Sequence, residues 1–550
     1  PQRTPIFNGG LTVEVAVWKD LVKWNDVAKA AGKWRFWAVS CVKAFAGDVY
    51  FSSQWHGILM KWDPDAELAD PTDTSGISQF VHVRQAMQDR GRELGRGSYW
   101  HGGLRSFDFH PLGNRTHGRF YVSAMESGPS ENATYADWKA RGVYLPWAAD
   151  QYYTEHPTPQ AEESVLIEFL YADGIADRST YRLLFRVECP IYDHTIRQIS
   201  FGVDDLTTYE NETLLLYVLH GDGSVESSDV GNGQYNDALG KILRINPIGG
   251  LVAATAGADH DDVDVHALEL GEGDYTTEHN PWDPLVDEPG FRLAPLPLDA
   301  AANRSPVPRE AFAIGFRNPH SLAFAKDGLM LLGEAARDNF EEVNVIKKGR
   351  DYGWPYYEGA FEHVIETEKD VKGLFHSALP PIASHYCPTC EIRFPLVSYG
   401  HRGFDQMQFN SVAIVGQNSV LENDSPAARH TDEPHSPHVY QDGAKYFLAD
   451  FPYSGELYYA YLEDARTAHA TGDPSAGDVE IAPMFRAKVK FDGVVYDSLR
   501  PVMAVNESDI YSRVNCRFGT GPDGAMLIIS KETGKIYKVV NTIADETTRR

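Results

Sequence analysis

A repeated unit runs through the chain: a short apolar segment, a tight turn rich in Gly, Asp or Asn, and a second short apolar segment. Apolar segments of this length, such as residues 119–122 and 525–528, are typical of β-strands. Gly, Asn and Asp accept the positive φ of hairpin turns, so each unit predicts a β-hairpin. The turns lie at residues 47–48, 111–114, 203–205, 326–328, 441–443 and 522–524.

A second element follows several of these hairpins: a glycine and then alternating apolar and polar residues, which we interpret as the outer strand of a β-propeller blade. Six hairpins then predict an all-β fold, a six-bladed β-propeller with long loop insertions, as one domain over residues 1–550. The alternative, two separate β domains, needs a linker, and no break in composition marks one. The glycine-led elements are at residues 57–61, 240–244, 455–459 and 534–538. Because a blade needs only ~40–50 residues, the wider gaps predict insertions near residues 130–165, 249–310 and 360–435.

The composition supports strands and excludes two classes of partner. Aromatic residues make up 12% of the chain, which favours β-structure. The 78 acidic side chains outnumber the 50 basic ones, for a net charge of −28. This charge argues against nucleic acid and against anionic membrane surfaces, because both attract basic proteins. No apolar run approaches the ~20 residues of a membrane-spanning helix, so we expect no membrane insertion.

Cysteines and glycosylation sequons indicate an oxidising compartment. Cys387 and Cys390 form a Cys-x-x-Cys pair without a second pair to complete a zinc ribbon, so we expect a local disulfide. The chain starts at Pro1 without Met, which is compatible with a removed signal peptide. We therefore expect a secreted, extracellular glycoprotein, or a periplasmic protein if the source is bacterial. Its six sequons are at Asn114, Asn132, Asn211, Asn303, Asn423 and Asn506.

Five motifs follow one another between residues 102 and 355. Together they resemble the soluble quinoprotein glucose/sorbosone dehydrogenase family, with its aldose sugar dehydrogenases and Hedgehog-interacting-protein-like relatives. The resemblance implies a β-propeller that oxidises a sugar with pyrroloquinoline quinone (PQQ) and Ca²⁺ and passes electrons to an external acceptor. The motifs are residues 102–111, 193–202, 239–247, 315–319 with 280–282 before it, and 341–344 followed by 349–355.

His194 is the residue that we expect to act as the catalytic base. Oxidation of an anomeric hydroxyl requires a base for the O–H proton while hydride leaves the carbon, and histidine titrates near neutral pH. The resemblance implies this role for His194 and a place beside it for Asp222, where a carboxylate fixes the ring tautomer and stabilises the imidazolium. The alternative for His194 is a structural histidine at the end of a strand.

Arg317 and Asn318 belong to the motif at residues 315–319. The resemblance implies that Arg317 lies near a quinone oxygen, where it would stabilise developing negative charge, and that Asn318 contacts cofactor or substrate. The alternative for Arg317 is a salt bridge between blades. His101 lies where relatives contact the sugar. A second histidine near His194 also permits a metal-dependent extracellular enzyme that uses His101 and His194.

The segment from Glu334 to Asp338 is expected to bind Ca²⁺. The resemblance implies that backbone carbonyls hold the ion, a role that Ala335, Ala336 or Arg337 could fill, while Glu334 and Asp338 could add charge. Another acidic cluster, residues 259–264, lacks the spacing of an EF-hand, and we interpret it as a solvated loop.

The cations expected to bind the carboxylates of PQQ are incomplete. Bacterial members of the family use a lysine that would fall near residues 452–454, which contain none. Arg513, Arg517 and Lys445 are candidate substitutes. The missing lysine favours a second hypothesis, a non-catalytic secreted propeller that binds Ca²⁺ and a protein or carbohydrate ligand.

Overall fold

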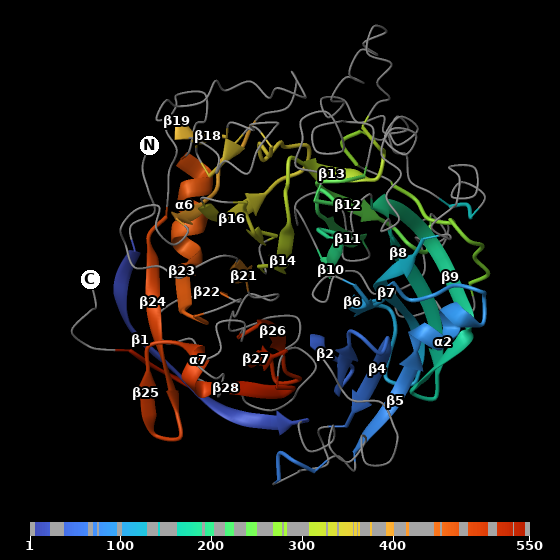
Figure 1. Cartoon of the computed structure of the whole chain (residues 1–550), viewed down its shortest axis with the longest axis horizontal. Helices are drawn as coiled ribbons and strands as arrows, with labels where there is room; N and C mark the ends of the chain where they lie inside the picture. Colours follow the sequence, from blue (N-terminus) through green and yellow to red (C-terminus); the bar gives the residue numbers. More distant parts are fainter. Residues whose placement is uncertain are drawn as a thin grey trace, which may run out of the picture. The chain divides into compact units, whose positions relative to one another are not determined.

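The structure is a computed structural model in which strands dominate (Figure 1). The chain divides into two compact units, the first of residues 1–79, 320–345 and 395–550, the second of residues 80–319 and 346–394. The predicted predominance of strands is confirmed, while six blades and a single domain remain predictions. The described residues are 6–21, 38–63, 70–73, 76–95, 102–128, 141–143, 162–189, 193–202, 215–224, 238–249, 268–277, 280–282, 307–325, 328–337, 340–355, 357–359, 361–363, 375–376, 392–400, 414–416, 445–450, 454–471, 482–503, 514–531 and 533–544.

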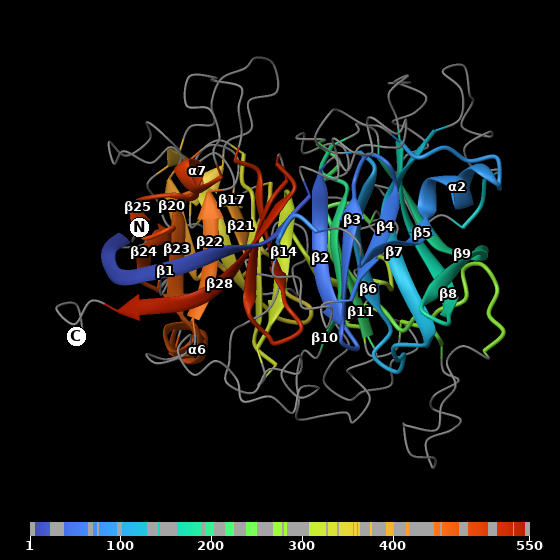
Figure 2. The same cartoon turned by 90° about the horizontal axis from the view of Figure 1, so that it is seen from below.

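The second unit contains two four-stranded antiparallel sheets. One consists of β6 (Leu104–Phe109), β7 (His117–Ser127), β8 (Glu162–Ala172) and β9 (Ile175–Cys189). The other consists of β10 (Ile196–Gly202), β11 (Leu215–His220), β12 (Lys241–Ile245) and β13 (Ala311–Ile314). Side chains of both sheets share one apolar core that includes Leu166, Phe185, Ile199 and Val218, so the two sheets pack together (Figure 2). The same unit holds a helix, α2 (Val83–Gln88), and a small sheet of β17 (Tyr357–Glu358), β18 (Phe361–His363) and β19 (Phe375–His376).

The first unit contains a thirteen-stranded sheet among its described residues. Two parallel pairings, β1 with β24 and β2 with β26, divide the main path of this sheet into runs of four strands. The path is β21 (Ile414–Gly416), β22 (Lys445–Asp450), β23 (Leu457–Tyr461), β24 (Met484–Phe491), β1 (Ile6–Asp20), β28 (Lys535–Ala544), β27 (Met526–Ser530), β26 (Cys516–Thr520), β2 (Val39–Phe45), β3 (Asp48–Ser53), β4 (Ile58–Trp62) and β5 (Ile77–His82), and β25 (Val494–Tyr496) pairs with β24.

A separate sheet and two helices complete this unit. The sheet consists of β14 (Pro319–Phe324), β15 (Met330–Glu334), β16 (Phe340–Ile346) and β20 (Val397–Gly400). The helices are α6 (Leu462–Thr471) and α7 (Leu499–Val502).

Three predicted hairpins are confirmed, because residues 47–48 join β2 to β3, residues 111–114 join β6 to β7, and residues 522–524 join β26 to β27. Turns 203–205 and 441–443 lie outside the described residues, as do two residues of turn 326–328.

The glycine-led strands form as β4, β12, β23 and β28, but their assignment as outer strands is wrong. Each is the third strand of a run of four, and β5, β13, β24 and β1 respectively lie beyond it. Two of these fourth strands are distant in sequence, since β13 follows the insertion predicted near 249–310 and β1 comes from the start of the chain. A repeat read from neighbouring residues does not detect a strand supplied from so far away.

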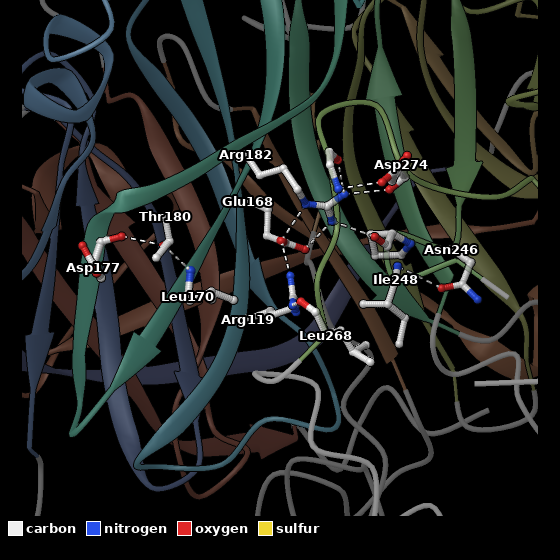
Figure 3. Close-up of polar contacts among 12 residues, drawn as sticks. Arg119, Glu168, Leu170, Asp177, Thr180, Arg182, Asn246, Ile248, Leu268 and Asp274 are labelled. Carbon is white, nitrogen blue, oxygen red and sulfur yellow. Dashed lines mark hydrogen bonds and ion pairs between the residues drawn. The ribbon is translucent and has the colours of Figure 1, made fainter. Parts of the chain in front are cut away.

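A buried ion group attaches residues 268–274 to the sheet of β6–β9 (Figure 3). Glu168 accepts hydrogen bonds from Nε and Nη2 of Arg182 at 2.8 and 2.6 Å, and from Nη1 of Arg119. The other N–H groups of Arg182 bind the carbonyl oxygens of Pro247, Gly271 and Asp274. Arg182 thus has protein partners for all five of its N–H groups, which makes this a structural group and not an anion site.

Candidate functional site

The second unit brings four of the predicted site residues close together: His194, Asp222, Arg317 and Asn318. The first unit holds Glu334, Ala335, Ala336 and Arg337 at and after the end of β15, and also holds Lys445 and Arg517. His101, Asp338 and Arg513 lie outside the described residues, as do Cys387 and Cys390. The roles predicted for those five residues stay predictions.

His194 and Asp222 meet at one end of a hairpin. Ile196, at the start of β10, pairs with His220, at the end of β11. His194 lies two residues before Ile196 and Asp222 two residues after His220, so the pairing brings them together. Nδ1 of His194 lies 2.6 Å from Oδ1 of Asp222, which is fully buried, and the backbone N–H of Ser224 also donates to Oδ1, at 2.8 Å. The carboxylate is therefore held in place by two donors on one oxygen.

The backbone at His194 has a φ of 48°, in the left-handed region. A residue other than glycine is held there at a cost of about 1–3 kcal/mol, and such strain concentrates at functional sites. The N–H of His194 donates to Oδ1 of Asp193 at 2.7 Å, which helps to hold this conformation.

Because the Asp222 carboxylate accepts from Nδ1, the neutral ring carries its proton on Nδ1 and a lone pair on Nε2. Nε2 of His194 has no hydrogen-bond partner among the residues that the structure describes. An imidazole with one nitrogen oriented by a carboxylate and the other free to accept a proton has the arrangement of a general base.

Gly221 allows the His194 and Arg317 segments to approach each other. A Cβ at Gly221 would lie 2.5 Å from the carbonyl oxygen of His194 and 2.8 Å from that of Arg317. The next N–H, of Asp222, donates to the carbonyl oxygen of Arg317 at 2.8 Å. Only a residue without a side chain fits between these two carbonyls, which places Arg317 beside the dyad.

Gly315 likewise allows the motif at residues 349–355 to approach the segment that contains Arg317. Its φ is +85°, and a Cβ there would lie 2.2 Å from Oδ1 of Asp351. The N–H of Trp354 donates to the carbonyl oxygen of Gly315 at 3.1 Å, and its indole Nε1 donates to Oδ2 of Asp222 at 3.0 Å. The sequence motif contains Trp354, but nothing in its local pattern indicates a partner 132 residues away.

Asn318 is buried, and its Oδ1 accepts a hydrogen bond from Nε of Arg197 at 3.1 Å. This hydrogen bond uses one of the two lone pairs of the amide oxygen and fixes the orientation of the side chain. Arg317 is partly exposed, with its guanidinium carbon 5.7 Å from the centre of the Trp354 ring.

Behind the dyad lies a buried polar group of Ser164, Cys189 and His220. Nδ1 of His220 donates to the carbonyl oxygen of Gly221 at 2.6 Å, and Nε2 lies 3.1 Å from Oγ of Ser164. The same hydroxyl accepts from the N–H of Ile196 at 3.2 Å. Burial lowers the pKa of His220 to about 4 and raises the pKa of the Cys189 thiol to about 12. The low pKa makes the buried His220 ring a weak base, and the raised pKa keeps Cys189 a thiol and not a thiolate, so these two groups support the site from behind.

At the predicted calcium segment, Glu334 converges with two side chains of β16. Nδ2 of Asn344 lies 3.4 Å from Oε2 of Glu334 and 3.2 Å from Oε2 of Glu342, and all three residues are buried. Oδ1 of Asn344 has no partner among the described residues. Two carboxylates and an amide are residue types that supply oxygen ligands to Ca²⁺, and exchange of the Asn344 amide oxygen and nitrogen would turn the oxygen toward both carboxylates.

Glu342 and Asn344 were missed as candidate ligands. Their spacing of two residues puts them on one face of a strand, a signal that the sequence contains. The described residues hold no group of three or more His, Cys, Asp or Glu placed to share a metal.

Two of the cations proposed for the PQQ carboxylates lie in strands of the first unit. Burial lowers the pKa of Arg517 to about 10, and its Nη1 donates to the carbonyl oxygen of Cys516 at 2.8 Å. Lys445 is buried with Nζ 5.2 Å from the centre of the Tyr461 ring. Arg517 keeps its positive charge at neutral pH and is partly exposed, and a guanidinium is a type of group that pairs with carboxylates.

Residues 296–374 match the family model described as glucose/sorbosone dehydrogenase. The HIPL2 protein of Arabidopsis thaliana is 26% identical over 267 residues, which are 47% of this chain and 30% of that protein. Quinoprotein glucose dehydrogenase B of Acinetobacter calcoaceticus is 42% identical over 48 residues, 9% of this chain and 10% of that protein.

Among solved structures, the PQQ-bound form of aldose sugar dehydrogenase from Streptomyces coelicolor aligns over 98% of this chain and 100% of its own, with 13% identity and a TM-score of 0.46. The predicted resemblance to the glucose/sorbosone dehydrogenases is confirmed. The matched region spans only 30% of the length of HIPL2. No helix among the described residues is long and apolar enough to cross a membrane.

Proposed function

We propose that this chain, which resembles the glucose/sorbosone dehydrogenases, is a quinoprotein that oxidises a soluble aldose and passes the electrons to an external acceptor. One observation carries the proposal: Nδ1 of His194 is bound to the buried Asp222 carboxylate at 2.6 Å, while Nε2 has no partner among the described residues. An imidazole held in this way is arranged to act as a general base.

In this proposal Nε2 of His194 takes the proton of the anomeric hydroxyl. The Asp222 carboxylate then stabilises the imidazolium, and because Asp222 is fully buried, water screens this attraction little. The guanidinium of Arg317 offers N–H donors to an oxygen that gains negative charge. PQQ, when bound, supplies the two-electron acceptor for the hydride that leaves the sugar carbon.

The predicted calcium and cofactor residues include oxygen ligands and cations of the types that the two cofactors require. Glu334, Glu342 and Asn344 would contribute oxygen ligands to Ca²⁺, together with backbone carbonyls after β15. Arg517 would bind a carboxylate of PQQ, with Lys445 as a further candidate.

We further propose that the chain is a six-bladed propeller and a secreted glycoprotein. The runs of four strands in the described residues support the first part. The exposed turn position of Asn114, the one sequon asparagine that the structure describes, supports the second.

The proposal is tested by titrating purified apo protein with PQQ and Ca²⁺ while the absorption spectrum is recorded, and then assaying dye reduction with a panel of aldoses. We expect a spectral change and turnover. His194→Ala should lower kcat by at least ~10²-fold, whereas His117→Ala, at an exposed histidine at the start of β7, should leave it unchanged. Absence of both the spectral change and turnover in the unmodified protein would refute the quinoprotein assignment.

A second candidate is a non-catalytic propeller that binds Ca²⁺ and a protein or carbohydrate ligand. The lack of a lysine at residues 452–454 favours it. In the same titration this candidate predicts calorimetric binding of Ca²⁺ that does not depend on PQQ, with no spectral change on addition of PQQ.

A further inference from the structure

We infer that Trp354 is a positioning residue for the His194–Asp222 dyad and couples it to Arg317. The inference rests on the proposed function of His194 as a base. Trp354 contacts the carboxylate of Asp222 through Nε1 and the guanidinium of Arg317 through the face of its ring.

The backbone determines where the indole lies. The N–H groups of Tyr352 and Trp354 donate to the carbonyl oxygens of Ile314 and Gly315, at 2.9 and 3.1 Å. The segment from Asp351 to Trp354 thus runs parallel to the end of β13, and its last hydrogen bond is to Gly315, two residues before Arg317. Trp354 is 3% exposed, so its ring is confined by packing and its N–H has a defined direction.

The indole N–H completes the hydrogen bonding of the Asp222 carboxylate. Oδ1 accepts from Nδ1 of His194 and from the N–H of Ser224, while Oδ2 accepts from Nε1 of Trp354. A donor on Oδ2, in addition to the two on Oδ1, restrains rotation of this buried carboxylate. Asp222 then keeps the proton of the His194 ring on Nδ1, which leaves Nε2 as the acceptor.

The face of the Trp354 ring contacts the guanidinium of Arg317. A guanidinium at 5.7 Å from an indole centre is attracted to the ring quadrupole. Loss of the N–H alone should therefore affect the dyad, whereas loss of the aromatic ring should also release Arg317.

The experiment compares Trp354→Phe, which removes the N–H but keeps an aromatic face, with Trp354→Leu, which removes both. Trp62→Phe is the matched control, because Trp62 is also 3% exposed and its Nε1 has no partner among the described residues. The first readout is the tautomer of His194 in apo protein with ¹⁵N-labelled histidine, where the His194 signal is identified by its loss in His194→Gln. The second readout is kcat and KM in the presence of PQQ and Ca²⁺.

We expect Trp354→Phe to increase the Nε2–H tautomer of His194 and to lower kcat by about tenfold to a hundredfold, as for other groups that orient a catalytic residue from behind. KM should change little in this variant, and Trp354→Leu should also weaken PQQ binding. Trp62→Phe should alter neither tautomer nor kcat. An unchanged tautomer in Trp354→Phe, or the same change in Trp62→Phe, would overturn the inference.

A tautomer change in a protein whose unmodified form has no turnover would support the positioning role and refute only the proposed function. If Trp354→Phe does not fold, a comparison of the unmodified protein with Asp222→Asn tests the hydrogen bond from Trp354 to Asp222 instead. The indole N–H resonance of Trp354 should move between these two proteins, and no movement would overturn the inference.

Discussion

Substitution of Gly221 by alanine tests the close approach on which the site is built. The new methyl carbon would lie 2.5 Å from the carbonyl oxygen of His194 and 2.8 Å from that of Arg317. Ordinary contacts begin at 3.4 Å, so these two carbonyls must move away by roughly 0.9 and 0.6 Å. A displacement of this size in a catalytic group costs about 10²-fold in rate, and overpacking of a buried site costs about 1–3 kcal/mol.

The assay is kcat for dye reduction with saturating PQQ and Ca²⁺, combined with thermal unfolding. We expect Gly221→Ala to remain folded with a lower midpoint and to lose about two orders of magnitude in kcat. Gly76→Ala is the control, because a Cβ at Gly76 would lie 3.4 Å from its nearest neighbour, a side-chain carbon of Trp62, and has room. An unchanged kcat in Gly221→Ala would show that the carbonyls separate without displacing His194 or Arg317, which would refute the reasoning.

Three further predictions concern stability, calcium and pH. Glu168→Gln should lower the free energy of unfolding in urea by about 3–5 kcal/mol because it removes the carboxylate that the buried guanidinium groups of Arg119 and Arg182 share, whereas Asp89→Asn, at a salt bridge whose side chains are 38% and 54% exposed, should lower it by at most ~1 kcal/mol. Asn344→Ala should weaken Ca²⁺ binding about tenfold or more in calorimetry, and equal affinity would remove Asn344 from the ligand set. His220 in the unfolded chain takes up a proton below its ordinary pKa of 6.5, whereas burial lowers its pKa in the folded protein to about 4. The free energy of unfolding should therefore fall as the pH is lowered from 6.5 to 4, by roughly 3 kcal/mol at pH 4. His220→Gln should flatten that pH dependence, and an unchanged slope would contradict it.

The strands and turns of this chain could be predicted because their signals are local. Alternating apolar and polar residues give a strand its buried face, and Gly or Asp next to it permits the turn, as at residues 47–48 and 522–524. The strand beyond each glycine-led strand could not be assigned in this way. β1, for example, comes from the start of the chain and pairs with β28 near its end.

The candidate site also combines residues that the sequence motifs indicated with residues that only the structure brings in. The resemblance carried by short motifs pointed to His194, Asp222 and Arg317, and the structure brings these three together. It did not indicate Trp354, whose role depends on a hydrogen bond to a residue 132 positions away. It implied calcium ligands among the backbone carbonyls after Glu334, and it gave no sign that side chains of the neighbouring strand β16 lie against Glu334.

The sequence by itself determined the strand-rich class, the positions of three hairpins, and the residue types available for chemistry, because each depends on a few neighbouring residues. Tertiary structure alone decided which of those residues meet. Gly221 and Gly315 permit contacts at distances that any side chain would prevent, and these contacts join three motifs into one site. Such contacts depend on shape at the junction of distant segments, which the order of residues within each segment does not reveal.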